Sequence, residues 1–179
     1  MNKKTQELYQ AAVKFAGIKH DGQSMPHYKA SYMVHISNVA MEVMLAYQNE
    51  PNFDLDLAVQ IALLHDTIED TNTTYEEICE LFSASIADGV LALTKDESLP
   101  KEDQMIDSLN RIKLISKEAK LVKICDRITN LQSPPDSWDK QKIIKYHSEA
   151  KQIANAMKGE NSYLDVRIEE RIKAYEQYF

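Results

Sequence analysis

The chain has 179 residues, 44% of them hydrophobic and 27% charged, which suits one globular domain spanning residues 1–179. A net charge of −7 argues against nucleic-acid binding, which relies on Lys and Arg to neutralise phosphates, but it allows one small anionic ligand beside a bound cation. Only four glycines and five prolines are present, so helices are favoured over a many-stranded fold. The sequence shows no signal peptide and no apolar run of membrane-spanning length, so we expect a cytoplasmic protein that does not bind a membrane.

In the first half of the chain, apolar residues three and four apart predict three helices. The first lies near the N-terminus and is followed by an irregular polar stretch, 19–31. The second carries His35. Asp54 is placed to cap the third, which is apolar until it reaches His65.

Further on, Thr74 and Glu77 have the spacing of a capping box that opens another helix, and the segment TKDESLPKED, 94–103, predicts a loop. Ser116 is expected to cap a long helix that stops before the Pro134-Pro135 pair, and a helix over 140–158 is expected to stop at Gly159. A last helix completes the chain. The prediction is an all-α, single-domain bundle of roughly eight to ten helices.

The chemistry is concentrated where the third helix ends, in LLHDTIEDT. There His65, Asp66, Glu69 and Asp70 follow a run of residues that must be buried. If the helix continues, His65 and Glu69 share one face and the two aspartates share the next. Four titratable groups would be costly to desolvate without a partner, so a bound cation is the simplest explanation.

Two other polar residues interrupt apolar helices. Asp126 and Asn130 lie one turn apart in LVKICDRITNL, and His35 lies among apolar neighbours in YMVHISNVA. Taken singly, a buried histidine is usually hydrogen-bonded in a core, and Asp126 can pair with Lys123 or Arg127. Taken together, these positions supply two imidazoles and two carboxylates for one ion, from His35, His65, Asp66 and Asp126.

A mixed nitrogen and oxygen ligand set suits Mn²⁺, Fe²⁺ or Zn²⁺ better than Ca²⁺. Such an ion lowers the pKa of a bound water and supplies a nucleophile at neutral pH. Glu69 and Asp70 would lie beside that water, able to orient it or to move a proton.

The ordered motifs resemble the HD phosphohydrolases, and within them the stand-alone small alarmone hydrolases of the Rel/SpoT type, metazoan SpoT homologues included. The resemblance starts at the H-x-G-Q segment, 20–23, passes through YMVHISNVA and LLHDTIEDT, and reaches TKDESLPK, where the family has T-D-D-x-S/T-L-P-K. AKLVKICDRITNL then matches the family's AKLVKLADKLxNL, and a P-x-x-W segment ends at Trp138. It covers nearly the whole chain.

The resemblance implies residue roles and a reaction. The four candidate ligands would hold a divalent metal, usually Mn²⁺, Glu69 and Asp70 would be the catalytic pair, and Asn130 would touch the ribose or a phosphate of a small nucleotide. The implied reaction removes pyrophosphate from the 3′ position of ppGpp or pppGpp. Adenine alarmones and the 2′-phosphate of NADPH are further substrates of such hydrolases.

The sequence departs from the family in its positive charge. After H-x-G-Q the family has an Arg-Lys pair, whereas this chain has SMPHYKASYMVHI, with Ile36 where proline is expected and only Lys29 and His27 as cationic replacements. The basic run after L-P-K is replaced by EDQMID. Each lost charge-assisted phosphate contact costs about 1.5–3 kcal/mol, so several together can change the substrate.

The candidate substrate-binding residues are therefore Asn130, Lys29, Tyr146 and Lys123, and Lys95 and Lys101 could also reach a phosphate. The C-terminal tyrosines favour a packing or self-association face, which leaves a homo-oligomer open. Two other functions stay open: a phosphatase for another nucleotide, such as NADPH or a nucleoside monophosphate, and a non-catalytic nucleotide sensor or antitoxin of the same fold.

Overall fold

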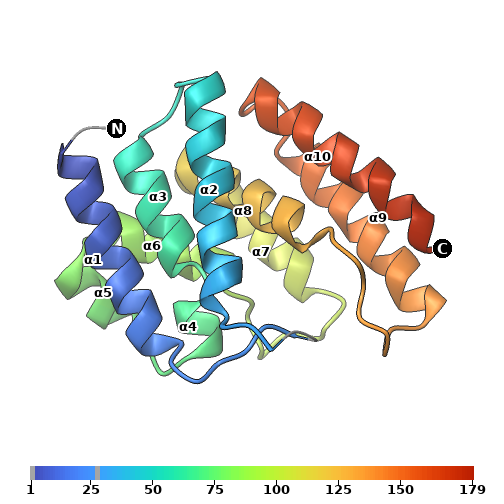
Figure 1. Cartoon of the computed structure of the whole chain (residues 1–179), viewed down its shortest axis with the longest axis horizontal. Coiled ribbons are helices and arrows are strands. Elements are labelled where there is room, and N and C mark those ends of the chain that lie inside the picture. The colour runs from blue at the N-terminus through green and yellow to red at the C-terminus, as the bar shows by residue number, and fades with distance from the viewer. Residues whose placement is uncertain (1–2, 27–28) are drawn as a thin grey trace.

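The computed structural model describes residues 3–26 and 29–179 (Figure 1). These residues form ten α-helices and one short 3-10 helix, without a named strand; a single antiparallel bridge joins Ser24 and Ser31. The helices are α1 (Lys3–Lys19), α2 (Met33–Asn49), α3 (Leu55–Leu64), α4 (Thr67–Asp70), α5 (Tyr75–Leu81), α6 (Ala84–Leu93), α7 (Gln104–Lys113), α8 (Lys117–Asn130), α9 (Lys140–Ala156), α10 (Ser162–Tyr175) and η1 (Glu176–Tyr178). The predicted all-α class is confirmed.

Most helix ends lie where the sequence places them. The side-chain oxygens of Asp54, Thr74 and Ser116 each accept a hydrogen bond from the backbone N–H three residues further on, and so cap α3, α5 and α8. Helix α9 ends at Ala156, shortly before Gly159, whose φ of 88° is in the left-handed region that glycine adopts without steric cost.

Two breaks interrupt the helices in this region, the first at the predicted end of the third helix and the second at a place that was not predicted. The third helix does not continue through LLHDTIEDT: α3 ends at Leu64, and the chain turns at His65 and Asp66 before the short α4 begins. The Thr67 hydroxyl donates to the Leu64 carbonyl (2.7 Å), replacing a backbone bond at this turn. A second break, capped by Ser83, separates α5 from α6.

Helix α3 forms the centre of the bundle, because it packs against α1, α2, α6 and α8 (Figure 1). Every residue from Ala58 to Leu64 is buried. Helix α6 approaches closely at Gly89, where an added Cβ would lie 2.5 Å from Cδ1 of Ile61. The α9–α10 pair covers the side of the bundle formed by α8. This packing fixes the ends of α3 and α8 relative to α2.

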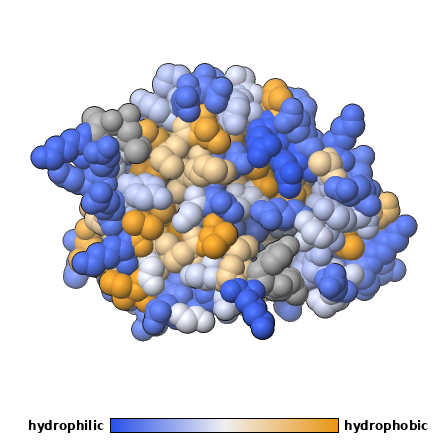
Figure 2. Space-filling model, viewed as in Figure 1, coloured by the Kyte–Doolittle hydropathy of each residue, from blue (hydrophilic) through white to orange (hydrophobic). Residues whose placement is uncertain are grey.

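The surface is mostly polar at its edges, while apolar side chains gather over the middle of the face along which α2 runs (Figures 1 and 2). Val34, Met41 and Leu45 of α2 are exposed by 44%, 42% and 36%. Within the described ranges, no helix combines the length and hydropathy needed to span a bilayer.

Candidate metal and phosphate site

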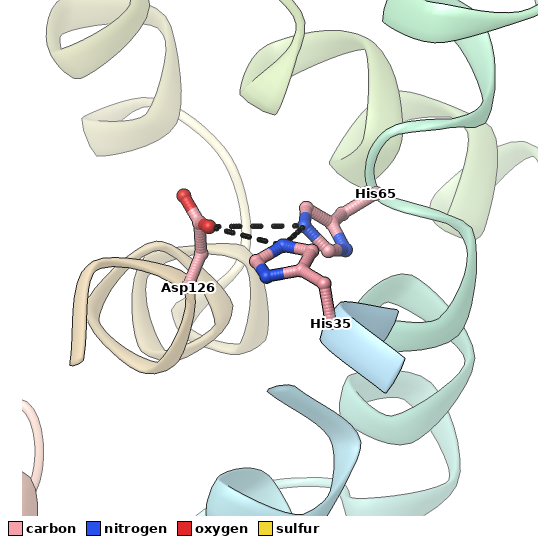
Figure 3. A group of neighbouring side chains, drawn as sticks. All are labelled: His35, His65 and Asp126. Atoms are coloured by element: carbon pink, nitrogen blue, oxygen red, sulfur yellow. Dashed lines mark hydrogen bonds and ion pairs between the residues drawn. The ribbon is translucent and has the colours of Figure 1, made fainter. Parts of the chain in front are cut away.

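Three helices that are distant in sequence bring their polar residues to one point (Figure 3). His35 comes from the first turn of α2, His65 from the C-cap of α3 and Asp126 from α8. The Nε2 atoms of the two histidines are 3.2 Å apart. Oδ1 of Asp126 lies 3.4 Å from Nε2 of His35 and 3.9 Å from Nε2 of His65. Both histidines are buried, whereas Asp126 is partly open to solvent.

Asp66 joins this cluster from the turn between α3 and α4. Its Oδ2 lies 3.0 Å from Nε2 of His65 and 3.5 Å from Nε2 of His35. The same oxygen accepts a 2.6 Å hydrogen bond from the hydroxyl of Tyr32. The break at His65 and Asp66 therefore lets two successive side chains face the same point, which a continuous helix would not allow.

The arrangement fits a divalent metal. Nδ1 of His65 lies 2.7 Å from the carbonyl oxygen of Ala62, so the neutral ring carries its proton on Nδ1 and leaves Nε2 as a free ligand atom. Ligands bound at about 2.1 Å to one ion are roughly 3 Å apart in neighbouring positions, close to the separations found here. His35, His65, Asp66 and Asp126 would hold the ion.

Without a metal, the imidazoles and carboxylates stabilise one another's charged forms. Burial lowers the pKa of His35, but hydrogen bonds and charges from Asp126 and Asp66 outweigh it and raise the pKa to about 9. Burial opposes ionisation of Asp126, yet His35, Lys123 and His65 bring its pKa below the usual range. The pKa of Asp66 is lowered in the same way by His65 and His35. A metal ion bound here would take the place of the imidazole protons beside these two carboxylates.

Glu69 and Asp70, the predicted catalytic pair, both line the small cavity of about 140 Å³ at this cluster. Glu69 accepts from the side-chain Nζ of Lys95 (2.6 Å) and from its backbone N–H (3.0 Å). Asp70 accepts from Nε2 of Gln23 (3.0 Å), and Oε1 of that amide lies 2.6 Å from Nδ1 of His20. Each carboxylate is thus held by its own partner.

The four predicted substrate-binding residues lie in different places. Lys123 and Asn130 line the same cavity as Glu69 and Asp70, called the metal cavity from here on. Asn130 also donates to Oδ1 of Asp126 (2.5 Å). Tyr146 lines a second cavity of about 370 Å³, which Asn130 also borders, and its ring lies 4.1 Å from the Arg127 guanidinium. Lys29 is exposed and, within the described part of the chain, does not belong to the lining of either cavity. His27 lies outside the described residues.

Sequence reasoning missed the partners that orient the site. Tyr32 precedes His35 by one turn, and Gln23 lies in an irregular loop, so no helical period singles out either. The H-x-G-Q motif contains Gln23 but gives no hint that it contacts Asp70, which is 47 residues further along the chain.

Comparisons with known proteins agree with this geometry. The model of the HD domain matches residues 33–131. The guanosine-3′,5′-bis(diphosphate) 3′-pyrophosphohydrolase MESH1 of Danio rerio is 32% identical over 175 residues, covering 95% of each chain. The guanosine-3′,5′-bis(diphosphate) 3′-pyrophosphohydrolase of Aquifex aeolicus is 33% identical over 71% of this chain and 18% of its own length.

The fold has also been seen in a solved structure. That structure, of a metazoan SpoT orthologue described as hydrolysing ppGpp, superposes with a TM-score of 0.81 at 24% identity, covering 100% of this chain and 98% of the other. The match extends beyond residues 33–131, so the C-terminal helix pair belongs to the shared architecture. The chain belongs to the HD domain family.

Proposed function

We propose that this protein is a metal-dependent hydrolase that removes the 3′-pyrophosphate from ppGpp or pppGpp. The observation that carries the proposal is the convergence of His35, His65, Asp66 and Asp126, with two further carboxylates at the edge of the same cavity. The relatives from Danio rerio and Aquifex aeolicus are named for this reaction. The mixed donor set suits Mn²⁺, Fe²⁺ or Zn²⁺, and Mn²⁺ is proposed because the resemblance implies it.

When bound, the metal acts as a Lewis acid and lowers the pKa of water in the cavity. Glu69 and Asp70 then accept and move the proton of the attacking water, because they are the carboxylates of this cavity that lie outside the metal cluster. Lys95 holds Glu69 from one side, and Gln23 holds Asp70 from the other. The Tyr32 hydrogen bond fixes the orientation of Asp66.

The second cavity supports a nucleoside as the rest of the substrate. It is lined by the rings of Trp138, Tyr146 and Tyr175, and Asn130 connects it to the metal cavity. Two hydroxyl groups of its lining, Thr129 Oγ1 and Tyr175 OH, are buried and have no hydrogen-bond partner among the described residues. A planar base would find aromatic surface to pack against in this cavity.

The direct test is incubation of the purified chain with Mn²⁺ and ppGpp, with GDP and pyrophosphate as the expected products. EDTA should abolish turnover, and Mn²⁺ should restore it. Asp66→Ala should lose both metal binding and turnover, whereas Glu69→Gln should lose turnover but keep the metal. If the wild type hydrolyses none of ppGpp, pppGpp and ppApp, this assignment is wrong.

A phosphatase for another nucleotide is the second candidate, because Lys29 is exposed and its loop has no Arg-Lys pair. A panel containing NADPH and nucleoside monophosphates, scored separately for phosphate and pyrophosphate, distinguishes the two enzymes. Nucleotide binding that persists in Asp66→Ala, without turnover in the wild type, would instead indicate a sensor. We also expect a cytoplasmic location and keep a homo-oligomer as a hypothesis.

A further inference from the structure

Lys95, one of the two loop lysines that the sequence places within possible reach of a phosphate, lines the metal cavity. It follows α6 in the 94–103 loop, where the resemblance in sequence leads one to expect an aspartate. Its ammonium lies 2.6 Å from Oε1 of Glu69, and its backbone N–H donates to Oε2 of the same carboxylate. Two contacts to one carboxylate fix both the loop and the start of the Lys95 side chain at the rim of the cavity.

The charge balance of the metal cavity makes each cation in it important. Among the described residues, its lining contains four carboxylates, those of Asp66, Glu69, Asp70 and Asp126, and two ammonium groups, those of Lys95 and Lys123. A divalent ion would bring the sum of these charges to zero. A pyrophosphate group entering the cavity would therefore meet no net positive field and would depend on direct contacts to individual N–H donors.

Lys95 and Lys123 differ in how freely each can donate to a phosphate. The side chain of Lys123 is only 13% exposed, and its ammonium lies 3.6 Å from Oδ2 of Asp126. It therefore forms an ion pair with one of the proposed metal ligands. Lys95 keeps half of its side chain exposed, and of its three ammonium protons Glu69 engages only one. Lys95 can therefore donate to an incoming phosphate while it keeps its bond to Glu69.

Lys95 and Glu69 also border a third hollow, of about 570 Å³. That hollow contains the carboxylates of Asp96, Glu97 and Asp107. Its Arg111 already donates to Asp107 and to the backbone carbonyls of Leu91 and Thr94. A phosphate would be repelled there. The charges therefore direct an anion to the metal side of Lys95.

We propose that the Lys95 ammonium, held at the cavity rim by Glu69, binds a phosphate group of the substrate and helps to set the preference for pyrophosphate. This inference deepens the proposed function and rests on it. Lys95 would thus replace part of the positive charge that the family's Arg-Lys pair supplies and that the loop around Lys29 lacks.

The test measures binding of labelled inorganic pyrophosphate to the full chain in excess Mn²⁺ by equilibrium dialysis. Lys95→Gln should raise the Kd for pyrophosphate about tenfold, the loss expected for one exposed charge-assisted contact, and Lys95→Arg should restore most of it. Lys113→Gln, a matched loss of charge at an exposed residue of α7, should leave the Kd unchanged. The Kd for Mn²⁺ alone should be the same in all four proteins.

An unchanged pyrophosphate Kd in Lys95→Gln would overturn the proposal, as would an equal loss of Mn²⁺ binding. Turnover of ppGpp gives a second measurement: KM should rise in Lys95→Gln more than kcat falls. A fall in kcat alone would mean that Lys95 only positions Glu69, which also contradicts the proposal. If the wild type does not hydrolyse ppGpp, the proposed function fails, but pyrophosphate binding still tests Lys95.

Discussion

The hydroxyl of Tyr32 donates a 2.6 Å hydrogen bond to Oδ2 of Asp66, the oxygen that also lies 3.0 Å from Nε2 of His65. Tyr32 immediately precedes α2, whereas Asp66 lies in the turn after α3. Burial and the negative charge of Asp66 raise the pKa of Tyr32, so the hydroxyl stays protonated and remains a donor. This bond ties the start of α2 to the turn that presents two of the four proposed ligands.

We predict that Tyr32→Phe weakens Mn²⁺ binding by about tenfold, because Asp66 loses the bond that orients it. Isothermal titration with Mn²⁺ measures the change. The phenylalanine ring keeps the contacts with the rings of His20 and His35, so the fold should be retained. Tyr75→Phe is the matched control, because its hydroxyl also donates to a carboxylate, that of Asp88, but far from the site. Equal affinities in Tyr32→Phe and wild type would contradict this role.

The second prediction concerns Gln23, whose amide links His20 to Asp70. Gln23→Ala should lower kcat for the 3′-pyrophosphate nucleotide by roughly tenfold to a hundredfold, because Asp70 loses its orientation. The Kd for Mn²⁺ should not change, since Asp70 lies outside the metal cluster. Stopped assays of product release over a range of substrate concentrations separate kcat from KM. Gln177→Ala, at an exposed glutamine near the C-terminus, should behave as wild type.

The sequence predicts most of the fold because helix signals are local. Asp54, Thr74 and Ser116 cap the helices that they were expected to cap, since the capping bond spans only three residues. The end of the third helix near His65 was predicted, whereas the break at Ser83 was not, because no glycine or proline interrupts residues 75–88.

The candidate site likewise contains residues that the sequence predicts and residues that it does not. His35, His65, Asp66 and Asp126 stand out as polar residues in apolar helices, and the structure brings all four together. Their roles as ligands stay predictions, as do those of Glu69 and Asp70. Lys95 and Gln23 lie in irregular segments, where no period indicates which way a side chain points. Their contacts are set by the packing of distant helices, which a single sequence does not specify.

A third prediction tests the packing that places α3. Gly89→Ala should destabilise the protein by about 1–2 kcal/mol, because the new methyl group would lie 2.5 Å from Cδ1 of the fully buried Ile61. Gly17→Ala in α1 is the matched control: no atom lies within 4 Å of the added Cβ, so the better helix propensity of alanine should stabilise by about 0.5–1 kcal/mol. Urea unfolding followed by circular dichroism measures both. Equal stability of the two variants would mean that α6 can move away from α3 at little cost.

The last prediction concerns pH and the start of α10. Oε2 of Glu50 accepts hydrogen bonds from the hydroxyl (2.7 Å) and the backbone N–H (2.6 Å) of Ser162, and these bonds lower the pKa of Glu50 below its ordinary value of 4.5. A carboxyl group whose pKa is lower in the folded state stabilises the fold above its unfolded pKa, and this stabilisation is lost as the pH falls through the folded pKa. Glu50→Gln should therefore lower the Tm at about pH 7, and its difference from wild type should shrink towards about pH 4. Thermal melts at a series of pH values measure this, with Glu80→Gln at an exposed position of α5 as the control that should show no such trend. A Tm difference that stays constant with pH would show that the ionised form of Glu50 does not stabilise this helix end.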